Sequence, residues 1–139
     1  MPLVSPFAPD PLVDGRQSER AMTVRRGVQR LMQTLNVSML PEMPLDSGRR
    51  ADLVCLSDKG EIAIVEIKTS IQDFRVDRKW PIYRLHCDRL YFATHPGVPT
   101  EIFPEECGLI LTDGYDAEVL REAPLERLAP ATRKAMTLR

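Results

Sequence analysis

The fold is decided by residues 51–68, which read ADLVCLSDKGEIAIVEIK. Residues 52–56 and 61–68 are rich in apolar and β-branched side chains, which favours strands. The sequence Asp58-Lys59-Gly60 between them suits a three-residue hairpin loop, because its glycine can take the left-handed backbone conformation that such loops need. We therefore predict an antiparallel hairpin over residues 51–68.

The register of this hairpin brings charged side chains together at one end. If Ser57 pairs with Glu61, then Asp52 falls opposite Glu66, and directly opposed residues share a face of the sheet. Lys68 lies two residues beyond Glu66 and therefore on the same face. The run around Glu66 is otherwise apolar, so we predict that this strand is buried on both faces, where a carboxylate needs a partner.

Two carboxylates beside an ammonium favour a site for a divalent cation. Close carboxylates repel each other, and Mg²⁺ or Mn²⁺ between Asp52 and Glu66 would remove that repulsion. The carbonyl of Ile67 would add a further oxygen, and Lys68 would orient water and stabilise charge on a phosphate. This is the chemistry of phosphodiester hydrolysis. The alternative is an exposed ion pair at the ends of two strands.

The rest of the chain predicts an α/β protein of the α+β kind, with a central mixed sheet flanked by helices. Apolar side chains recur at helical spacing over residues 16–35, with Asp14 as a possible cap. Further strands are expected at residues 37–45, 89–94, 108–112 and 115–121, and further helices at residues 75–86 and 130–138, with residues 69–73 as a loop. Pro81 is expected either to disturb the helix over residues 75–86 or to mark its true first turn. We expect an irregular, proline-rich arm at residues 1–13 and one domain over residues 14–139.

Composition indicates a soluble protein of ordinary charge. The chain has 139 residues, 19 Lys and Arg, 20 Asp and Glu, and a formal net charge of −1. No apolar run approaches the ~20 residues of a membrane-spanning helix, and the start of the chain does not look like a signal peptide, so we expect a cytoplasmic protein without a membrane partner. The three unclustered cysteines argue against a disulfide framework and a zinc site.

The spacing of the charged residues resembles a known nuclease signature. Asp52, thirteen intervening residues and then Glu66-Ile67-Lys68 resemble the PD-(D/E)XK motif, with Ala51 where proline is usual. A wider set of segments, over about residues 24–120, resembles the MmcB family of bacterial proteins, which is tied to DNA repair and placed in the PD-(D/E)XK superfamily. These segments are residues 48–53, 65–68, 73–74, 77–81, 87–93 and 108–110, together with Tyr83.

The resemblance implies a restriction-endonuclease-like core that acts on DNA. It implies metal ligands at Asp52 and Glu66, with Mg²⁺ or Mn²⁺ as cofactor, and a catalytic role for Lys68. Similar enzymes that cut duplexes often pair their active sites, so a homodimer or a partner in a repair complex is open. The form of the DNA, and whether RNA is cut, do not follow from the sequence.

Five other residues are candidates near this site. Glu42 lies on the strand expected beside Asp52 and is a candidate for a further metal ligand; the alternative is an ordinary surface glutamate. Arg49 and Arg50 precede the site and are candidates for phosphate binding, although either could instead form an ion pair with an acidic neighbour. Lys79 and Tyr83 stand where RecB-type nucleases carry Gln-x-x-x-Tyr, and are candidates for nucleic-acid binding.

Structural roles compete with these functional ones. Tyr83 and Trp80 are also suited to anchoring a helix to the core, and Asp73 and Asp77 to capping a helix.

The leading hypothesis is a metal-dependent DNA nuclease, or a nuclease-like repair protein. The alternatives are a non-catalytic nucleic-acid- or protein-binding subunit of a repair complex, and an interaction domain whose acidic residues 101–126 meet a basic partner.

Overall fold

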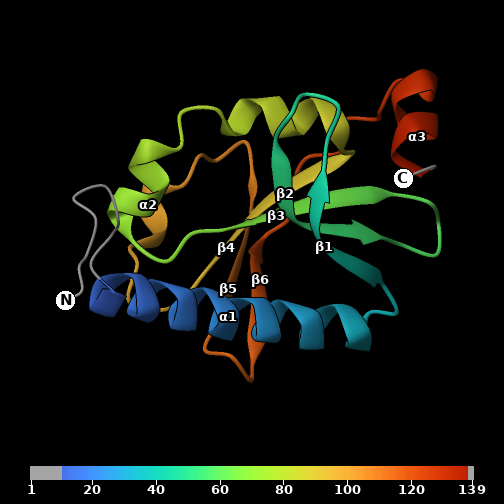
Figure 1. The fold of residues 1–139 in the computed structure, drawn as a ribbon. Helices are drawn as coiled ribbons and strands as arrows, with labels where there is room; N and C mark the ends of the chain where they lie inside the picture. Colours follow the sequence, from blue (N-terminus) through green and yellow to red (C-terminus); the bar gives the residue numbers. More distant parts are fainter. Residues whose placement is uncertain (1–10, 138–139) are drawn as a thin grey trace.

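A six-stranded mixed sheet carries the fold of residues 11–137, which are the residues that this computed structural model describes (Figure 1). The strands lie side by side in chain order, with β3, β4 and β5 parallel and the other neighbours antiparallel. The strands are β1 (Ser38–Pro44), β2 (Arg50–Leu56), β3 (Ile62–Ile67), β4 (Arg89–Thr94), β5 (Gly108–Thr112) and β6 (Ala117–Arg121). The helices are α1 (Pro11–Thr34), α2 (Ile71–Val76) and α3 (Pro130–Thr137), with 3₁₀ helices η1 (Trp80–His86) and η2 (Thr100–Ile102). The predicted mixed sheet with flanking helices is confirmed.

The central hairpin has the predicted register. Leu53 pairs with Val65 and Leu56 with Ile62, as the expected loop requires. Ser57 accepts a hydrogen bond from the N–H of Gly60 at 3.0 Å, and Gly60 has a φ of +82°. The glycine therefore takes the left-handed conformation for which it was expected.

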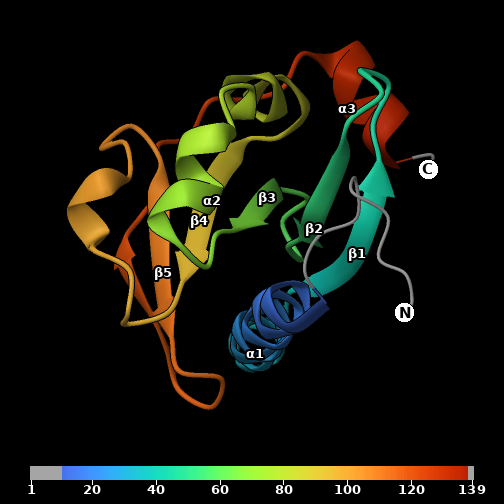
Figure 2. The same cartoon turned by 60° about the vertical axis from the view of Figure 1, so that its left-hand side comes forward.

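The sheet is covered on both faces, as Figure 2 shows. One face of β3 places Val65 and Ile67 in a core cluster with side chains of α1, such as Val28. The other face places Ile64 in a second cluster with Tyr83 of η1. Because β3 is buried on both sides, the prediction drawn from its apolar run is confirmed, and Glu66 lies on the face covered by η1. The three cysteines are free and buried, as expected of small hydrophobic side chains.

The first helix begins earlier than the sequence pattern indicated. It begins at Pro11, and proline is favoured in the first turn of a helix because its missing N–H has no helical partner there. The expectation of an irregular arm is therefore wrong for residues 11–13, and Asp14 lies inside the helix instead of capping it. The remainder of the expected arm, residues 1–10, lies outside the described residues.

The helix expected over residues 75–86 is two separate elements, α2 and η1, and the expectation that Pro81 marks a first turn is confirmed. Helix α2 begins within the segment expected to be a loop, because Ser70 caps it: its hydroxyl accepts the N–H of Asp73 at 3.0 Å, and Asp73 accepts the N–H of Thr69 at 3.0 Å. Pro81 disfavours the α conformation in the residue before it, and it lies in the first turn of η1. The break after α2 proves important for the site.

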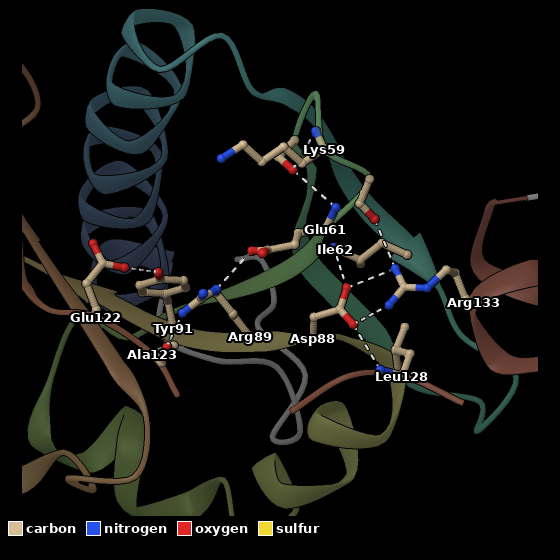
Figure 3. Close-up of polar contacts among 12 residues, drawn as sticks. Lys59, Glu61, Ile62, Asp88, Arg89, Tyr91, Glu122, Ala123, Leu128 and Arg133 are labelled. Atoms are coloured by element: carbon tan, nitrogen blue, oxygen red, sulfur yellow. Dashed lines mark hydrogen bonds and ion pairs between the residues drawn. The ribbon is translucent and has the colours of Figure 1, made fainter. Parts of the chain in front are cut away.

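A buried carboxylate fastens the end of the chain to the sheet (Figure 3). Asp88, which is 1% exposed, precedes β4 and accepts the N–H groups of Ile62 at 2.8 Å and Leu128 at 2.9 Å. Arg133 of α3 forms a two-pronged ion pair with the same carboxylate. Asp88 thus connects the start of β3 to the C-terminal helix. No helix in the described part of the chain is long and apolar enough to cross a membrane.

Candidate active site

The candidate site begins where β2 and β3 separate. Backbone pairing between the two strands ends at Leu53 and Val65. Beyond this pair, hydrogen bonds to carboxylate side chains replace the bonds between the two backbones. The N–H of Asp52 donates to Glu66 Oε2 at 2.8 Å, and the N–H of Ile67 donates to Asp52 Oδ2 at 2.8 Å. The two carboxylates are therefore inserted between the diverging strands, opposite each other as the register predicted.

Burial makes the charges on this pair costly. Burial first, and the neighbouring Asp52 carboxylate second, raise the pKa of Glu66 to about 8, against the backbone hydrogen bond from Asp52 and the attraction of Lys68. Burial also raises the pKa of Asp52, against the hydrogen bond from Ile67 and the attraction of Lys68 and Arg25. Two carboxylates that resist ionisation together form a site that a cation would stabilise.

Lys68 lies beside the pair but is bound elsewhere. Its ammonium Nζ donates to Asp77 Oδ2 at 2.8 Å, and the two side chains are 9% and 15% exposed. The other oxygen of Asp77 accepts the N–H of Lys79 at 3.2 Å. Asp77 is the C-cap of α2, so the break between α2 and η1 is what turns its carboxylate toward Lys68.

A cavity of about 600 Å³ opens onto these groups. It unites six of the eight residues singled out in the sequence: Arg49, Asp52, Glu66, Lys68, Lys79 and Tyr83. Its walls also include Ile67, Asp73, Val76, Asp77 and Arg78. Sequence reasoning missed Arg78 and assigned Asp77 to helix capping alone. A continuous helix over residues 75–86 would have hidden the contact between Asp77 and Lys68.

Glu42 is not among the residues that line this cavity. In β1 it lies between Pro41, which pairs with Leu53, and Met43, which pairs with Ala51, so its backbone is opposite Asp52 as expected. However, Glu42 has a φ of +55°, and its side chain is 58% exposed and lies 3.8 Å from Arg25. Its role as a metal ligand stays a prediction.

Arg50 and Tyr83 meet each other behind the cavity. The hydroxyl of Tyr83 donates to the backbone carbonyl of Arg50 at 3.4 Å, while the side chain of Arg50 is exposed. Tyr83 is 7% exposed and belongs to the core cluster under η1. Burial and the nearby carboxylates, Glu66 first, raise its pKa, so its hydroxyl stays protonated. Tyr83 therefore anchors η1 and also forms a wall of the cavity.

The donor set fits a hard divalent cation. Among the described residues no group of three or more His, Cys, Asp and Glu side chains is placed to hold a metal ion, so protein ligands would be few. Mg²⁺ is commonly held by one or two carboxylates and keeps several waters. Asp52 and Glu66 supply those two carboxylates, and the Ile67 residue that follows Glu66 lines the same cavity.

These features define a single-domain α+β protein with a buried carboxylate pair and a lysine in one cavity. The chain belongs to the MmcB-like family, described as DNA repair protein MmcB-like, whose model matches residues 8–139. It is also similar to a solved protein of unknown function from Silicibacter pomeroyi, with 39% identity and a TM-score of 0.81, over 86% of this chain and 82% of the other. None of the curated proteins matches the chain.

Proposed function

We propose that this protein is a metal-dependent phosphodiesterase that hydrolyses DNA. The observation that carries the proposal is the carboxylate pair of Asp52 and Glu66, inserted between separating strands and facing the same cavity as Lys68. The description of the family as DNA repair proteins supports DNA as the substrate. The spacing of the three residues and the mixed sheet are compatible with the PD-(D/E)XK superfamily.

The residues would divide the chemistry between them. Asp52 and Glu66 would hold Mg²⁺ or Mn²⁺, with coordination positions left for water and a phosphate oxygen. A bound cation supplies Lewis acidity and lowers the pKa of water. The ammonium of Lys68 would offset negative charge that develops on the phosphate. Arg49 and Lys79, which line the same cavity, bind flanking phosphates.

The test is cleavage of labelled single-stranded, duplex and branched DNA, and of RNA, with Mg²⁺ or Mn²⁺. Glu66→Ala and Lys68→Ala are run beside the wild type, with Asp58→Ala in the exposed hairpin loop as the matched control. We expect cleavage by the wild type and by Asp58→Ala, and none by the two site variants. Absence of cleavage by the wild type on every substrate, or cleavage that persists unchanged in Glu66→Ala and Lys68→Ala after repurification, would overturn the proposal.

A second function is favoured by the ion pair of Lys68 with Asp77, which occupies the ammonium that catalysis would use. In this alternative the protein binds DNA as a subunit of a repair complex and does not cut it. Divalent cations distinguish the two functions, because a ligand that binds only the folded state raises the melting temperature. We expect Mn²⁺ to raise it in the wild type and not in Glu66→Ala. DNA binding without any such rise would favour the non-catalytic subunit.

A further inference from the structure

The outer side of α2 forms a second cavity that adjoins the candidate active site. This cavity has a volume of about 740 Å³, and its walls are Ile71, Gln72, Arg75, Val76 and Arg78. Val76 and Arg78 line both cavities. The two cavities therefore share walls at the C-terminal end of α2.

The arginines of the second cavity are available for a ligand. Arg75 and Arg78 are exposed, and neither forms an ion pair with any residue that the structure describes. Elsewhere arginines are used within the fold, as in the pairs of Arg84, Arg89 and Arg133 with carboxylates. A guanidinium that is not already paired presents a planar set of donors suited to phosphate.

The arrangement of charge fits a chain of phosphates better than a single anion. Arg49 and Lys79 line the first cavity, and Arg75 lines the second, with Arg78 shared between them. Beside the shared arginine is Val76, an apolar side chain that is 68% exposed. Such a row of cations with apolar surface between them is complementary to a nucleic-acid strand, because phosphates can bind the cations while sugars and bases contact the apolar side chain.

The order of residues around the break in the chain connects this row of cations to catalysis. Asp77 turns inward and binds Lys68, whereas its two neighbours in sequence, Val76 and Arg78, line the outer cavity. A strand that lies along α2 would therefore contact the residues on both sides of the partner of Lys68.

We propose that Arg75 and Arg78 bind the nucleic-acid backbone next to the bond that is cut, so that the strand leaves the active-site cavity along the outer side of α2. This inference rests on the proposed function and specifies where its substrate runs. Binding at this surface is to phosphate and carries no sequence preference.

The first measurement is the salt dependence of DNA binding. Fluorescence anisotropy of labelled single-stranded and duplex DNA is measured at several salt concentrations for three proteins. These are the wild type, the double variant Arg75→Ala, Arg78→Ala, and the double variant Arg127→Ala, Lys134→Ala. The last pair removes two exposed cations, one in α3 and one in the segment just before it; Figure 1 shows α3 on the opposite side of the molecule from α2. Loss of two phosphate contacts should make the slope of log K against log salt shallower by about 1.4 to 1.8. The control pair should keep the wild-type slope.

The second measurement locates the contact on the DNA. Single phosphates near the cleavage point are replaced by neutral methylphosphonates. We expect one or two positions to weaken binding by the wild type and to have no further effect on the Arg75→Ala, Arg78→Ala protein, because coupled partners are not additive. Additive losses at every position would overturn the proposed path.

The outcomes separate this inference from the proposed function. Cleavage and a wild-type slope in the Arg75→Ala, Arg78→Ala protein would overturn the path along α2 and leave the nuclease intact. Normal DNA binding that depends on both arginines, without cleavage by the wild type, would support the path and overturn the nuclease. If the wild type binds no nucleic acid, both are wrong.

Discussion

Asp77 is the residue on which the position of Lys68 depends, because it holds the ammonium at 2.8 Å. We expect Asp77→Asn to lower kcat for DNA cleavage about 10- to 100-fold, the usual loss when a supporting partner in a metal site is removed. KM should change little, because the cations that bind phosphate remain. Steady-state kinetics with Asp77→Glu as the conservative variant is the measurement. Partial rescue by glutamate would support a positioning role, and an equal fall in kcat with both variants would contradict it.

The Glu66 carboxylate gives the metal-free protein a specific pH dependence. Its pKa rises on folding from the usual 4.5 to about 8, so the folded state binds its proton more tightly than the unfolded state. The stability that this group contributes is complete below pH 4.5 and is lost as the pH rises through about 8. At pH 8 we expect Glu66→Gln to be more stable than the wild type, by on the order of 3 kcal/mol.

Urea unfolding with a chelator present, from pH 5 to pH 8, measures this difference. Added Mg²⁺ should stabilise the wild type at pH 8 and leave Glu66→Gln unchanged, since a cation removes the repulsion that the amide has already removed. A wild type whose stability rises between these two pH values would contradict the assignment.

Residues fixed by strand register were the ones that the sequence predicted well. Asp52 and Glu66 follow from a period of two and a single loop, and six of eight candidates line one cavity. Glu42 shows the limit of that reasoning: its position along β1 is as expected, but a φ of +55° redirects its side chain. A backbone turn at a single residue is not visible in the period of the strand, and the Glu42 side chain lies 3.8 Å from Arg25 instead.

At the scale of elements, the hairpin was predictable, whereas the break between α2 and η1 was predictable only in part, from Pro81. Hairpin register depends on neighbours a few residues apart. Besides Pro81, distant aromatic rings hold the two pieces in place: Phe74 of α2 packs edge-to-face on Phe92 at 5.3 Å and on Phe103 at 5.1 Å, and Trp80 of η1 packs on Phe92 at 5.7 Å. The sheet thus fixes both pieces separately, and the turn between them supplies Asp77.

The contact between α1 and β5 is another feature that propensity alone would misjudge. Alanine is a better helix former than glycine by about 1 kcal/mol, so Gly27→Ala would be expected to stabilise an isolated helix. In the protein, a Cβ at Gly27 would meet Thr112 Oγ1 at 1.8 Å. That hydroxyl already donates to the carbonyl of Asp116 at 2.8 Å, so it is not free to move.

We therefore expect Gly27→Ala to lower the free energy of unfolding by about 1–3 kcal/mol, as overpacking does. Gln33→Ala, at an exposed position of the same helix, is the matched control and should be neutral or slightly stabilising. Urea unfolding of the two variants is the measurement. A Gly27→Ala protein as stable as the control would mean that α1 shifts along the sheet without loss.

Across the whole molecule, the candidate site lies at one end of β3, and the contact of Asp88 with Arg133 of α3, here called the C-terminal clasp, lies at the other. Asp52 is bonded to Ile67 at one end of that strand, and Asp88 is bonded to Ile62 at the other. The contact between Asp88 and Arg133 was not predicted, because the two residues are 45 positions apart and the segment between β6 and α3 has no periodic pattern that would place α3. It stabilises the fold at a distance from the residues proposed to cut DNA.

This separation predicts that stability can be lost without losing the site. Burial alone would raise the pKa of Asp88, but the hydrogen bonds from Arg133, Ile62 and Leu128 outweigh it and lower the pKa. The carboxylate therefore stabilises the protein at neutral pH, and this contribution is lost as the pH falls through a value below 3.8. Asp88→Asn removes the charge that Arg133 pairs with and places an amide donor in a buried position that accepts N–H groups. Because the side chain of Arg133 is 32% exposed and water can solvate it, we expect the free energy of unfolding to fall by about 1–3 kcal/mol.

Glu126→Gln is the matched control for Asp88→Asn. Glu126 lies in the segment before α3, and the substitution weakens its exposed ion pair with Arg84 of η1. It should change stability by less than about 1 kcal/mol. Urea unfolding at neutral pH measures both variants, and cleavage assayed well below each melting temperature should equal that of the wild type per folded molecule. If Asp88→Asn abolished cleavage while folded, the Asp88 contact and the candidate site at the two ends of β3 would be coupled and not independent. If it unfolded as the wild type does, the Asp88 clasp would contribute nothing, and the C-terminal helix would be held by its apolar contacts alone.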